Sequence, residues 1–288
     1  MNRFWKKRLP AILLAMVMVL GMVPAAMAAD CPSGQHQWGA WYESTTDSGK
    51  HERQCLVSGC SGKETWCVTE YLEPIIEKTI GAEELGNIFY LKSTWNNEDI
   101  ATAVATFQEM IGKNYFDPAG IALGNDEVKA NFIAGKYAFY QNGSWNCGEI
   151  DAMDAKIEVG EFPVMNADKA SLGMLIGGPN DCLAVNASSP NAEIAAKAVW
   201  EIARDVCHYG TLAGSGLPSW TPDYDTSSIN KLSVAVADMV ANSKGMVLFG
   251  DNAQSANIAN IYLDYVAQVY GSQIDGQQFI SGLTADIG

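Results

Sequence analysis

One short stretch carries the residues best suited to binding a ligand: Phe132 to Trp145, with the sequence FIAGKYAFYQNGSW. Asn142, Gly143 and Ser144 interrupt the apolar run and offer a side-chain amide, an unhindered backbone and a hydroxyl. Trp145 follows directly and adds an apolar ring face with a single N–H donor. These groups suit a ligand that is flat, partly apolar and rich in hydroxyls. A core aromatic is the alternative interpretation of Trp145.

Two glycine-containing loops hold the other candidate binding residues. The stretch GSGLPSW ends at Trp220, which could sandwich a sugar ring if it lies near Trp145. An exposed loop tryptophan without a ligand is the alternative. Gly177 and Gly178 separate two short apolar runs, and such a pair allows close backbone approach or hinge motion. A simple tight turn would explain the two glycines equally well.

A helix, a glycine turn and a short strand must position the Trp145 stretch. Asn125 is expected to open the helix, and Phe132 and Ile133 close its apolar run. Gly135 can take the left-handed conformation that ends a helix. The aromatic-rich run over residues 137–140 then predicts a short strand that leads into the polar loop.

A second helix is indicated upstream of this stretch. Asn96 or Asn97 is expected to cap it, and apolar residues then recur at helical spacing as its buried face: Ile100, Val104, Phe107 and Ile111. The remaining expected elements are a helix and turn over 68–86, strands over 156–162, 174–176 and 182–185, a long helix from Pro190 with Ala195, Val199, Ile202 and Val206 on one face, and helices over 227–240, 252–270 and 276–283.

Catalytic motifs are not evident in the sequence. It contains no assembled nucleophile set, phosphate loop or H-E-x-x-H pattern. Carboxylates are plentiful, but no spacing singles out a glycosidase-type pair, and Glu149 with Asp151 is only a suggestive neighbour pair. Cys147, Cys182 and Cys207 are expected as small buried residues, or as one disulfide and a spare thiol. Binding without turnover is therefore the predicted activity.

Composition narrows the class of protein and of partner. The chain has 288 residues, enough for one large domain or two ordinary ones, and 48% of them are hydrophobic, which is typical of a globular protein. The formal net charge is −15. An acidic surface argues against nucleic acid or an anionic membrane as the partner.

The first 28 residues resemble a secretory signal. A basic start precedes an apolar run over residues 9–23 and then Ala26-Met27-Ala28, an A-x-A cleavage pattern. We expect an exported protein, at the cell surface, outside the cell or in a periplasm, with no transmembrane segment after cleavage. A lipoprotein acylated at Cys31 is the alternative, although Ala29 and Asp30 fit a lipobox poorly.

The segment from Cys31 to Cys67 has a composition of its own, with four cysteines, two histidines and three tryptophans. So small a segment cannot build a sufficient core and needs a covalent or metal staple. Disulfides among its cysteines are one possibility. A second is a structural zinc held by four residues: Cys31, His36, Cys55 and Cys60. Unpaired thiols are the third. No other cofactor is expected.

Several motifs together resemble the solute-binding proteins of ABC importers, in the carbohydrate-binding family that includes maltose-binding protein. The stretch F..GKYAFYQNGSW is similar to that family's helix, strand and tryptophan loop, whose tryptophan commonly stacks on the sugar. The resemblance covers roughly residue 70 to the end. Further segments follow in the family's order: 95–116, 177–185, 189–204, Gly216-Leu217-Pro218 and 269–283.

The resemblance implies an α/β, helix-rich, periplasmic-binding-protein-like lobe over 68–288, mostly the second lobe, after a signal at 1–28 and a small Cys/His/Trp module at 29–67. It implies binding of an oligosaccharide through Trp145, Asn142, Ser144, Gly178 and Trp220, and an ABC permease or a partner lobe as the protein partner. Most of the first lobe is expected to be absent. A surface adhesion protein, or a non-transporting relic, is the alternative function.

Overall fold

The computed structural model describes residues 42–43, 51–52, 57–153, 157–179 and 181–288. The predicted signal at 1–28, and with it Cys31, His36 and Cys55, lies outside these residues. No helix among the described residues is long and apolar enough to cross a bilayer.

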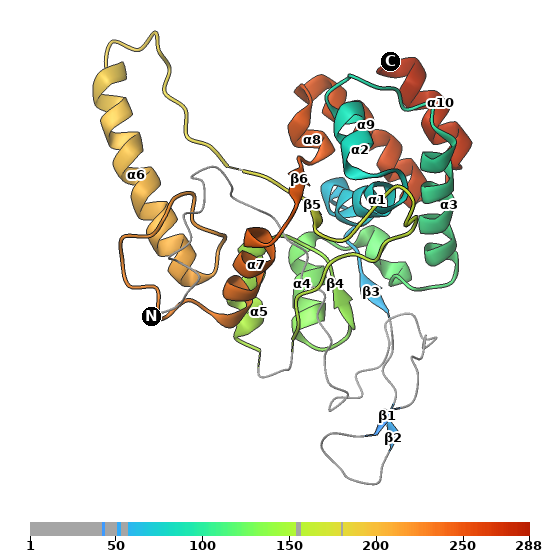
Figure 1. The fold of residues 1–288 in the computed structure, drawn as a ribbon, viewed down its shortest axis with the longest axis horizontal. Coiled ribbons are helices and arrows are strands. Elements are labelled where there is room, and N and C mark those ends of the chain that lie inside the picture. Colours follow the sequence, from blue (N-terminus) through green and yellow to red (C-terminus); the bar gives the residue numbers. More distant parts are fainter. Residues whose placement is uncertain (1–41, 44–50, 53–56, 154–156, 180) are drawn as a thin grey trace.

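Five helices form a packed unit, which we call the helical body (Figure 1). Helix α1 packs against α3 and α9, and α10 packs against the same two helices. Trp95 lies fully buried among Phe89, Tyr262 and Phe279, with ring centroids 5.4 to 5.9 Å from its own. The helices of the body are α1 (Thr65–Ile80), α2 (Ala82–Phe89), α3 (Glu98–Gly112), α9 (Ala256–Tyr270) and α10 (Gly276–Asp286).

Helix α1 runs through the centre of the body and is buried on nearly all sides. Its interior contains charged residues as well as apolar ones. Glu77 pairs with Lys78 at 2.9 Å, and the Lys78 ammonium also donates to the carbonyls of Ser171 and Met174. Glu73 accepts hydrogen bonds from the Gly250 amide and the Tyr262 hydroxyl, each at 3.1 Å. Partners inside the fold thus offset part of the cost of burying these polar groups, whereas Glu73 Oε2 and Glu77 Oε1 accept no hydrogen bond from the described residues.

Short strands join distant parts of the chain. Strand β3 (Ser58–Gly59) runs parallel to β4 (Phe139–Tyr140), and β5 (Met174–Ile176) runs parallel to β6 (Gly245–Val247). Strands β1 (Tyr42–Glu43) and β2 (His51–Glu52) form an antiparallel pair. Because β3 pairs with β4, residues 57–67 belong to the same folded unit as the residues that follow them. Helix α1 begins at Thr65, so the predicted boundary at residue 67 falls inside this helix.

A second, smaller core has members from three of the remaining helices, α4, α5 and α7. Asn97 caps α3 through the Asp99 amide, and α4 opens at Asn125 and ends before Gly135, as the sequence predicts. The predicted strand at 156–162 was wrong, since residues 157–162 form no strand, and the run at 182–185 is also irregular. The remaining helical elements are η1 (Pro118–Ala122), α4 (Asn125–Ile133), η2 (Ser144–Asn146), α5 (Cys147–Asp151), α6 (Ala192–Ala213), α7 (Lys231–Ala241) and α8 (Gly250–Ala253).

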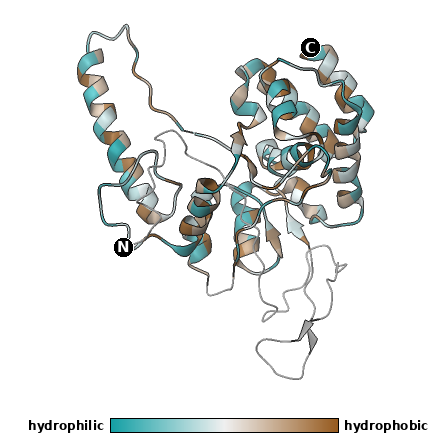
Figure 2. Cartoon of the chain, viewed as in Figure 1, coloured by the Kyte–Doolittle hydropathy of each residue, from teal (hydrophilic) through white to brown (hydrophobic). Residues whose placement is uncertain are grey.

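Helix α6 stands apart from the helical body (Figure 1, yellow). Its predicted apolar face exists, and Figure 2 shows hydrophobic residues along the helix. That face is nevertheless open to solvent, since Ile202 is 51% and Val206 64% exposed. Ile194 and Tyr209 on the same helix are exposed as well.

Candidate ligand-binding site

A hollow of about 390 Å³ opens where α1, α8 and the start of α4 meet the Trp145 loop. Near its start, helix α1 contributes three side chains within little more than one turn: the indole of Trp66, the hydroxyl of Thr69 and the carboxyl group of Glu70. Nine residues line the hollow: Trp66, Thr69, Glu70, Asn125, Trp145, Asp181, Phe249, Asp251 and Asn252.

Two indoles form one side of the hollow. The ring centroids of Trp66 and Trp145 are 6.0 Å apart and the ring planes are inclined by 60°, so neither ring covers the face of the other. Both side chains are half-buried. Glu64 holds the first indole by accepting a hydrogen bond from Trp66 Nε1 at 3.2 Å. Inclined, partly open aromatic faces can pack against the C–H groups of a ring with many hydroxyls.

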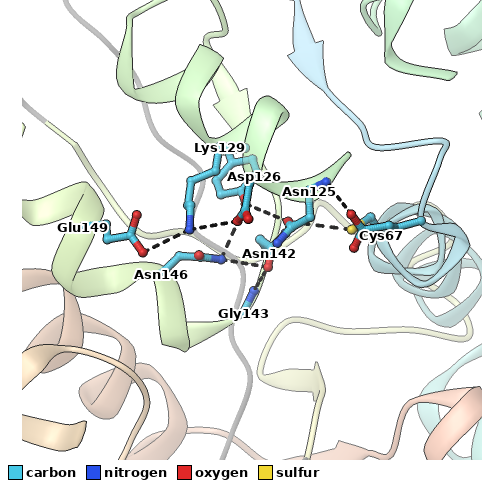
Figure 3. Close-up of polar contacts among 10 residues, drawn as sticks. Cys67, Asn125, Asp126, Lys129, Asn142, Gly143, Asn146 and Glu149 are labelled. Carbon is cyan, nitrogen blue, oxygen red and sulfur yellow. Dashed lines mark hydrogen bonds and ion pairs between the residues drawn. The ribbon is translucent and has the colours of Figure 1, made fainter. Parts of the chain in front are cut away.

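Asn142 fixes the loop that carries Trp145 (Figure 3). Its Oδ1 accepts hydrogen bonds from the Gly143 amide and from Asn146 Nδ2, both at 2.8 Å. Its Nδ2 donates to Asn125 Oδ1 at 2.9 Å. Because that oxygen of Asn125 is engaged, the N–H groups of its amide are what Asn125 can offer to a ligand in the hollow.

The polar wall of the hollow is acidic. Glu70 is only 4% exposed, and burial, together with the nearby Asp251, raises the pKa of its carboxyl to about 8. Burial also raises the pKa of Asp251, against hydrogen bonds from backbone amides that lower it. None of the nine lining residues is Lys, Arg or His.

Glu73 supports this wall from the interior. By accepting from the Gly250 amide it ties the start of α8 to α1, next to Asp251. Burial raises the pKa of Glu73 well above its ordinary value, and through its hydrogen bonds from Gly250 and Tyr262 the side chain joins two sides of the hollow.

Comparison with known proteins identifies the architecture. No family model matches the chain. A structure from work on xylan utilisation by Caldanaerobius polysaccharolyticus superimposes with a TM-score of 0.77 at 26% identity, covering 81% of this chain and 61% of that one. A Bacillus licheniformis sugar transporter in complex with stachyose gives a TM-score of 0.62 at 16% identity, covering 80% and 60%. The chain has a solute-binding-protein fold.

A Streptococcus pneumoniae solute-binding protein in complex with the blood group A-trisaccharide has the same fold, with a TM-score of 0.62, 14% identity and coverage of 96% and 70%. This chain spans about three fifths of the length of the C. polysaccharolyticus and B. licheniformis structures. One sequence relative, a glucose-6-phosphate 1-dehydrogenase of Ceratitis capitata, is 29% identical over 117 residues. That match covers 36% of this chain and 22% of the dehydrogenase, too little to carry an argument.

Within this solute-binding fold, the predicted site residues do not lie together. Trp145 lines the hollow, but Asn142 and Ser144 are buried beneath it, and Asn142 acts by holding the Trp145 loop. Gly178 is absent from the lining, and a side chain there would meet Leu248 at 2.2 Å, so its role in the structure is close packing.

Trp220 lies beside a second hollow, of about 580 Å³, along α6. Its ring stacks on Trp200 with centroids 5.8 Å apart and planes inclined by 21°. Mostly apolar residues line this hollow, among them Val199, Ile202 and Val206. The two predicted tryptophans therefore line different hollows, and Asp181 belongs to the lining of both.

The lining residues missed by the sequence analysis are chiefly Trp66, Glu70 and Asp251. Trp66 and Glu70 are four positions apart, the spacing that places two side chains on one face of a helix. This spacing could have linked the two residues, but the sequence analysis places Trp66 in the small Cys/His/Trp module and Glu70 in the domain that follows it. Nothing in the local sequence links Asp251 to them.

The described cysteines are free thiols: Cys60, Cys67, Cys147, Cys182 and Cys207. The disulfide considered among the last three does not form, and Cys60 and Cys67 are also unpaired. Cys60 is buried, and desolvation raises the pKa of its thiol to about 12. Its Sγ lies 4.0 Å from the Cys67 carbonyl oxygen. Among the described residues no cluster of three His, Cys, Asp or Glu could hold a metal.

Proposed function

We propose that the chain binds an oligosaccharide in the hollow between Trp66 and Trp145 and releases it unchanged. The observation that carries this proposal is the pair of inclined indoles above a polar wall. The indoles supply apolar faces, and Asn125 together with the carboxyl groups supplies hydrogen-bonding groups for hydroxyls. Neighbours in complex with stachyose and with the blood group A-trisaccharide support carbohydrate as the ligand class.

A binding screen tests the proposal. Purified protein is titrated with a panel of oligosaccharides, read by tryptophan fluorescence and confirmed by calorimetry. We expect a saturable ligand whose affinity falls in Trp145→Ala. Trp220→Ala is the matched control, because it removes an indole from the other hollow and leaves this one intact. If the folded protein binds none of the oligosaccharides in the panel, the result would count against carbohydrate binding.

Absence of turnover is a separate part of the proposal. The hollow has two carboxyl groups in its deeper wall, Glu70 and Asp251, so hydrolysis is a reasonable challenge. Prolonged incubation with a bound oligosaccharide, followed by chromatography, should return the ligand intact. Shortened products that disappear in Glu70→Gln would show that the site is a glycosidase.

We also propose that the protein is exported and serves an ABC permease. The predicted signal at residues 1–28 supports export. Fractionation of producing cells should find the protein beyond the cytoplasmic membrane, and sequencing its N-terminus should give Ala29 as the first residue. An N-terminus at Met1, with the protein inside the cell, would contradict export.

The exposed face of α6 supports a partner lobe. It carries Ile202, Val206 and Tyr209 open to solvent, and an apolar surface of this kind is characteristic of an interaction site. About two fifths of the length of the C. polysaccharolyticus and B. licheniformis structures is not matched by this chain. We propose that a polypeptide with the complementary α/β lobe of the solute-binding fold covers this face.

A photo-crosslinking amino acid at position 206, on this face of α6 and incorporated in the producing cell, tests the partner. Mass spectrometry of the adduct should identify a polypeptide with an α/β lobe of this fold. An adduct with a second copy of this chain would assign the face to a homodimer instead. If no adduct forms, this face of α6 remains exposed to solvent in the cell and has no protein partner.

A further inference from the structure

The charge of the hollow restricts which oligosaccharide it can hold. Its lining contains three carboxyl groups, on Glu70, Asp181 and Asp251, and no cationic side chain. A ligand that carries its own carboxylate would meet like charges with no counter-ion in the wall. A ligand that carries a cation would meet three potential partners.

Glu70 is the member of this wall that most needs a partner. It is buried and lines the hollow, yet among the described residues no group donates a hydrogen bond to its carboxyl. Glu73, one turn further along α1, differs because Gly250 and Tyr262 already donate to it. A buried polar side chain without a partner is costly unless a ligand supplies one.

The position of Glu70 favours a cationic donor from the ligand. It lies one helical turn from Trp66, and Asp251 is close enough to disfavour its ionised form. An ammonium group between them would neutralise the repulsion and form charge-assisted hydrogen bonds. The nearby indole faces also attract ammonium groups.

We propose that the hollow selects an oligosaccharide with a free amino group, of the hexosamine type, over its N-acetylated or uronic-acid counterpart. This selectivity rests on the proposed carbohydrate binding. The ammonium group pairs with Glu70 and Asp251, while the apolar face of the sugar ring packs on Trp66 and Trp145.

Calorimetry on matched ligands tests the selectivity. The probes are β-1,4-linked glucosamine oligomers, the same oligomers fully N-acetylated, and uronic-acid oligomers of equal length, all at one pH and low salt. We expect the amine form to bind about tenfold more tightly than the N-acetylated form, as one charge-assisted hydrogen bond predicts. The preference should shrink as salt is added.

Two variants locate the selectivity. Glu70→Gln and Asp251→Asn should each reduce the preference for the amine, measured as the ratio of the dissociation constants of the N-acetylated and amine oligomers, and should weaken the amine form more than the N-acetylated form. Glu201→Gln makes the same kind of change on α6, where the side chain is exposed, and should leave the preference intact. Melting temperatures of all three variants establish that they are folded.

The outcomes separate the two proposals. Equal or tighter binding of the N-acetylated form would overturn the selectivity and leave carbohydrate binding in place. A preference that survives both Glu70→Gln and Asp251→Asn would also overturn it. If no oligosaccharide of any class binds the folded protein, carbohydrate binding itself fails and the selectivity falls with it.

Discussion

Trp66 and Trp145 lie beside the hollow of the helical body, whereas Trp200 and Trp220 lie beside the hollow along α6. The first two rings are inclined by 60° and share their hollow with carboxyl and amide groups. The second two are stacked within 21° of parallel among aliphatic side chains. Each ring of the stacked pair therefore already covers one face of the other.

The contrast shows that a tryptophan in a glycine-containing loop does not define a ligand site. Polar neighbours and an uncovered ring face make the Trp145 hollow suitable for a hydroxylated ligand. Aliphatic neighbours and an exposed helix face make the α6 hollow suitable for packing against protein. The same kind of substitution should therefore have different effects on stability and on ligand affinity in the two regions.

The largest expected difference is in stability. Phe107 of α3 is fully buried against Phe116 and Tyr270, so Phe107→Ala should lower the free energy of unfolding by about 3–5 kcal/mol. Ile202→Ala on α6 should change it by no more than about 0.5 kcal/mol, since half of that side chain already contacts solvent. Denaturant titration measures both, and equal losses would mean that α6 is packed in solution.

Ligand affinity should separate the two tryptophan pairs next. Trp145→Ala should weaken oligosaccharide binding by about 2 kcal/mol, or roughly thirtyfold, with a modest change in melting temperature. Trp220→Ala should leave the affinity unchanged. Calorimetry gives both values, and similar losses in the two variants would remove the distinction between the hollows.

Asn142→Ala tests whether buried scaffolding beneath the hollow matters. The substitution removes hydrogen bonds to Asn125, Gly143 and Asn146 and leaves buried partners unsatisfied, which costs about 1–3 kcal/mol of stability. Ligand affinity should fall too, because Trp145 loses its fixed position. A variant with lower stability and unchanged affinity would show that the loop keeps its shape without this amide.

The last expected difference is a pH dependence that arises from the buried carboxyl groups of α1 and α8. The pKa of Glu70 rises from 4.5 to about 8 on folding, and the pKa values of Glu73 and Asp251 are also raised. The folded chain thus keeps protons that the unfolded chain releases, so this stability is present below pH 4.5 and is lost as pH rises towards 8. Each retained proton contributes a slope of at most about 1.4 kcal/mol per pH unit.

Glu70→Gln should reduce the loss of stability that accompanies rising pH. Melting temperatures measured across the pH range test this expectation. The exposed control Glu201→Gln on α6 should retain the slope of the unmodified chain. A melting temperature that rises between pH 5 and 8 in the unmodified chain would contradict the retained protons.

Local signals predicted much of the helical structure. Asn97 caps α3 as its position before Glu98 and Asp99 indicates, and Gly135 ends α4 with a φ of 77°. These features depend on a few neighbouring residues. The strand predicted at 156–162 rested on local apolar character alone, and no neighbouring strand pairs with residues 157–162 in the fold.

The site was predicted less completely, for reasons that lie in long-range contacts. Trp145 was found through its loop, but Glu70, Glu73 and Glu77 resemble a solvent-facing row in sequence, whereas α1 buries all three. Asp251 reaches the hollow only because α8 meets α1 through Glu73. The apolar face of α6 was predicted correctly, but periodicity cannot tell whether such a face is covered.

The separation between residues that hold the hollow and residues that rim it has a practical consequence for protein engineering. Asn142 and Glu73 maintain its shape from buried positions, while Asp181 and Asn252 line it from exposed ones. Randomising only the two rim positions should generate libraries of altered ligand preference in which most members still fold. The same chain could then serve as a scaffold for biosensors, with the two indoles as a built-in fluorescent reporter.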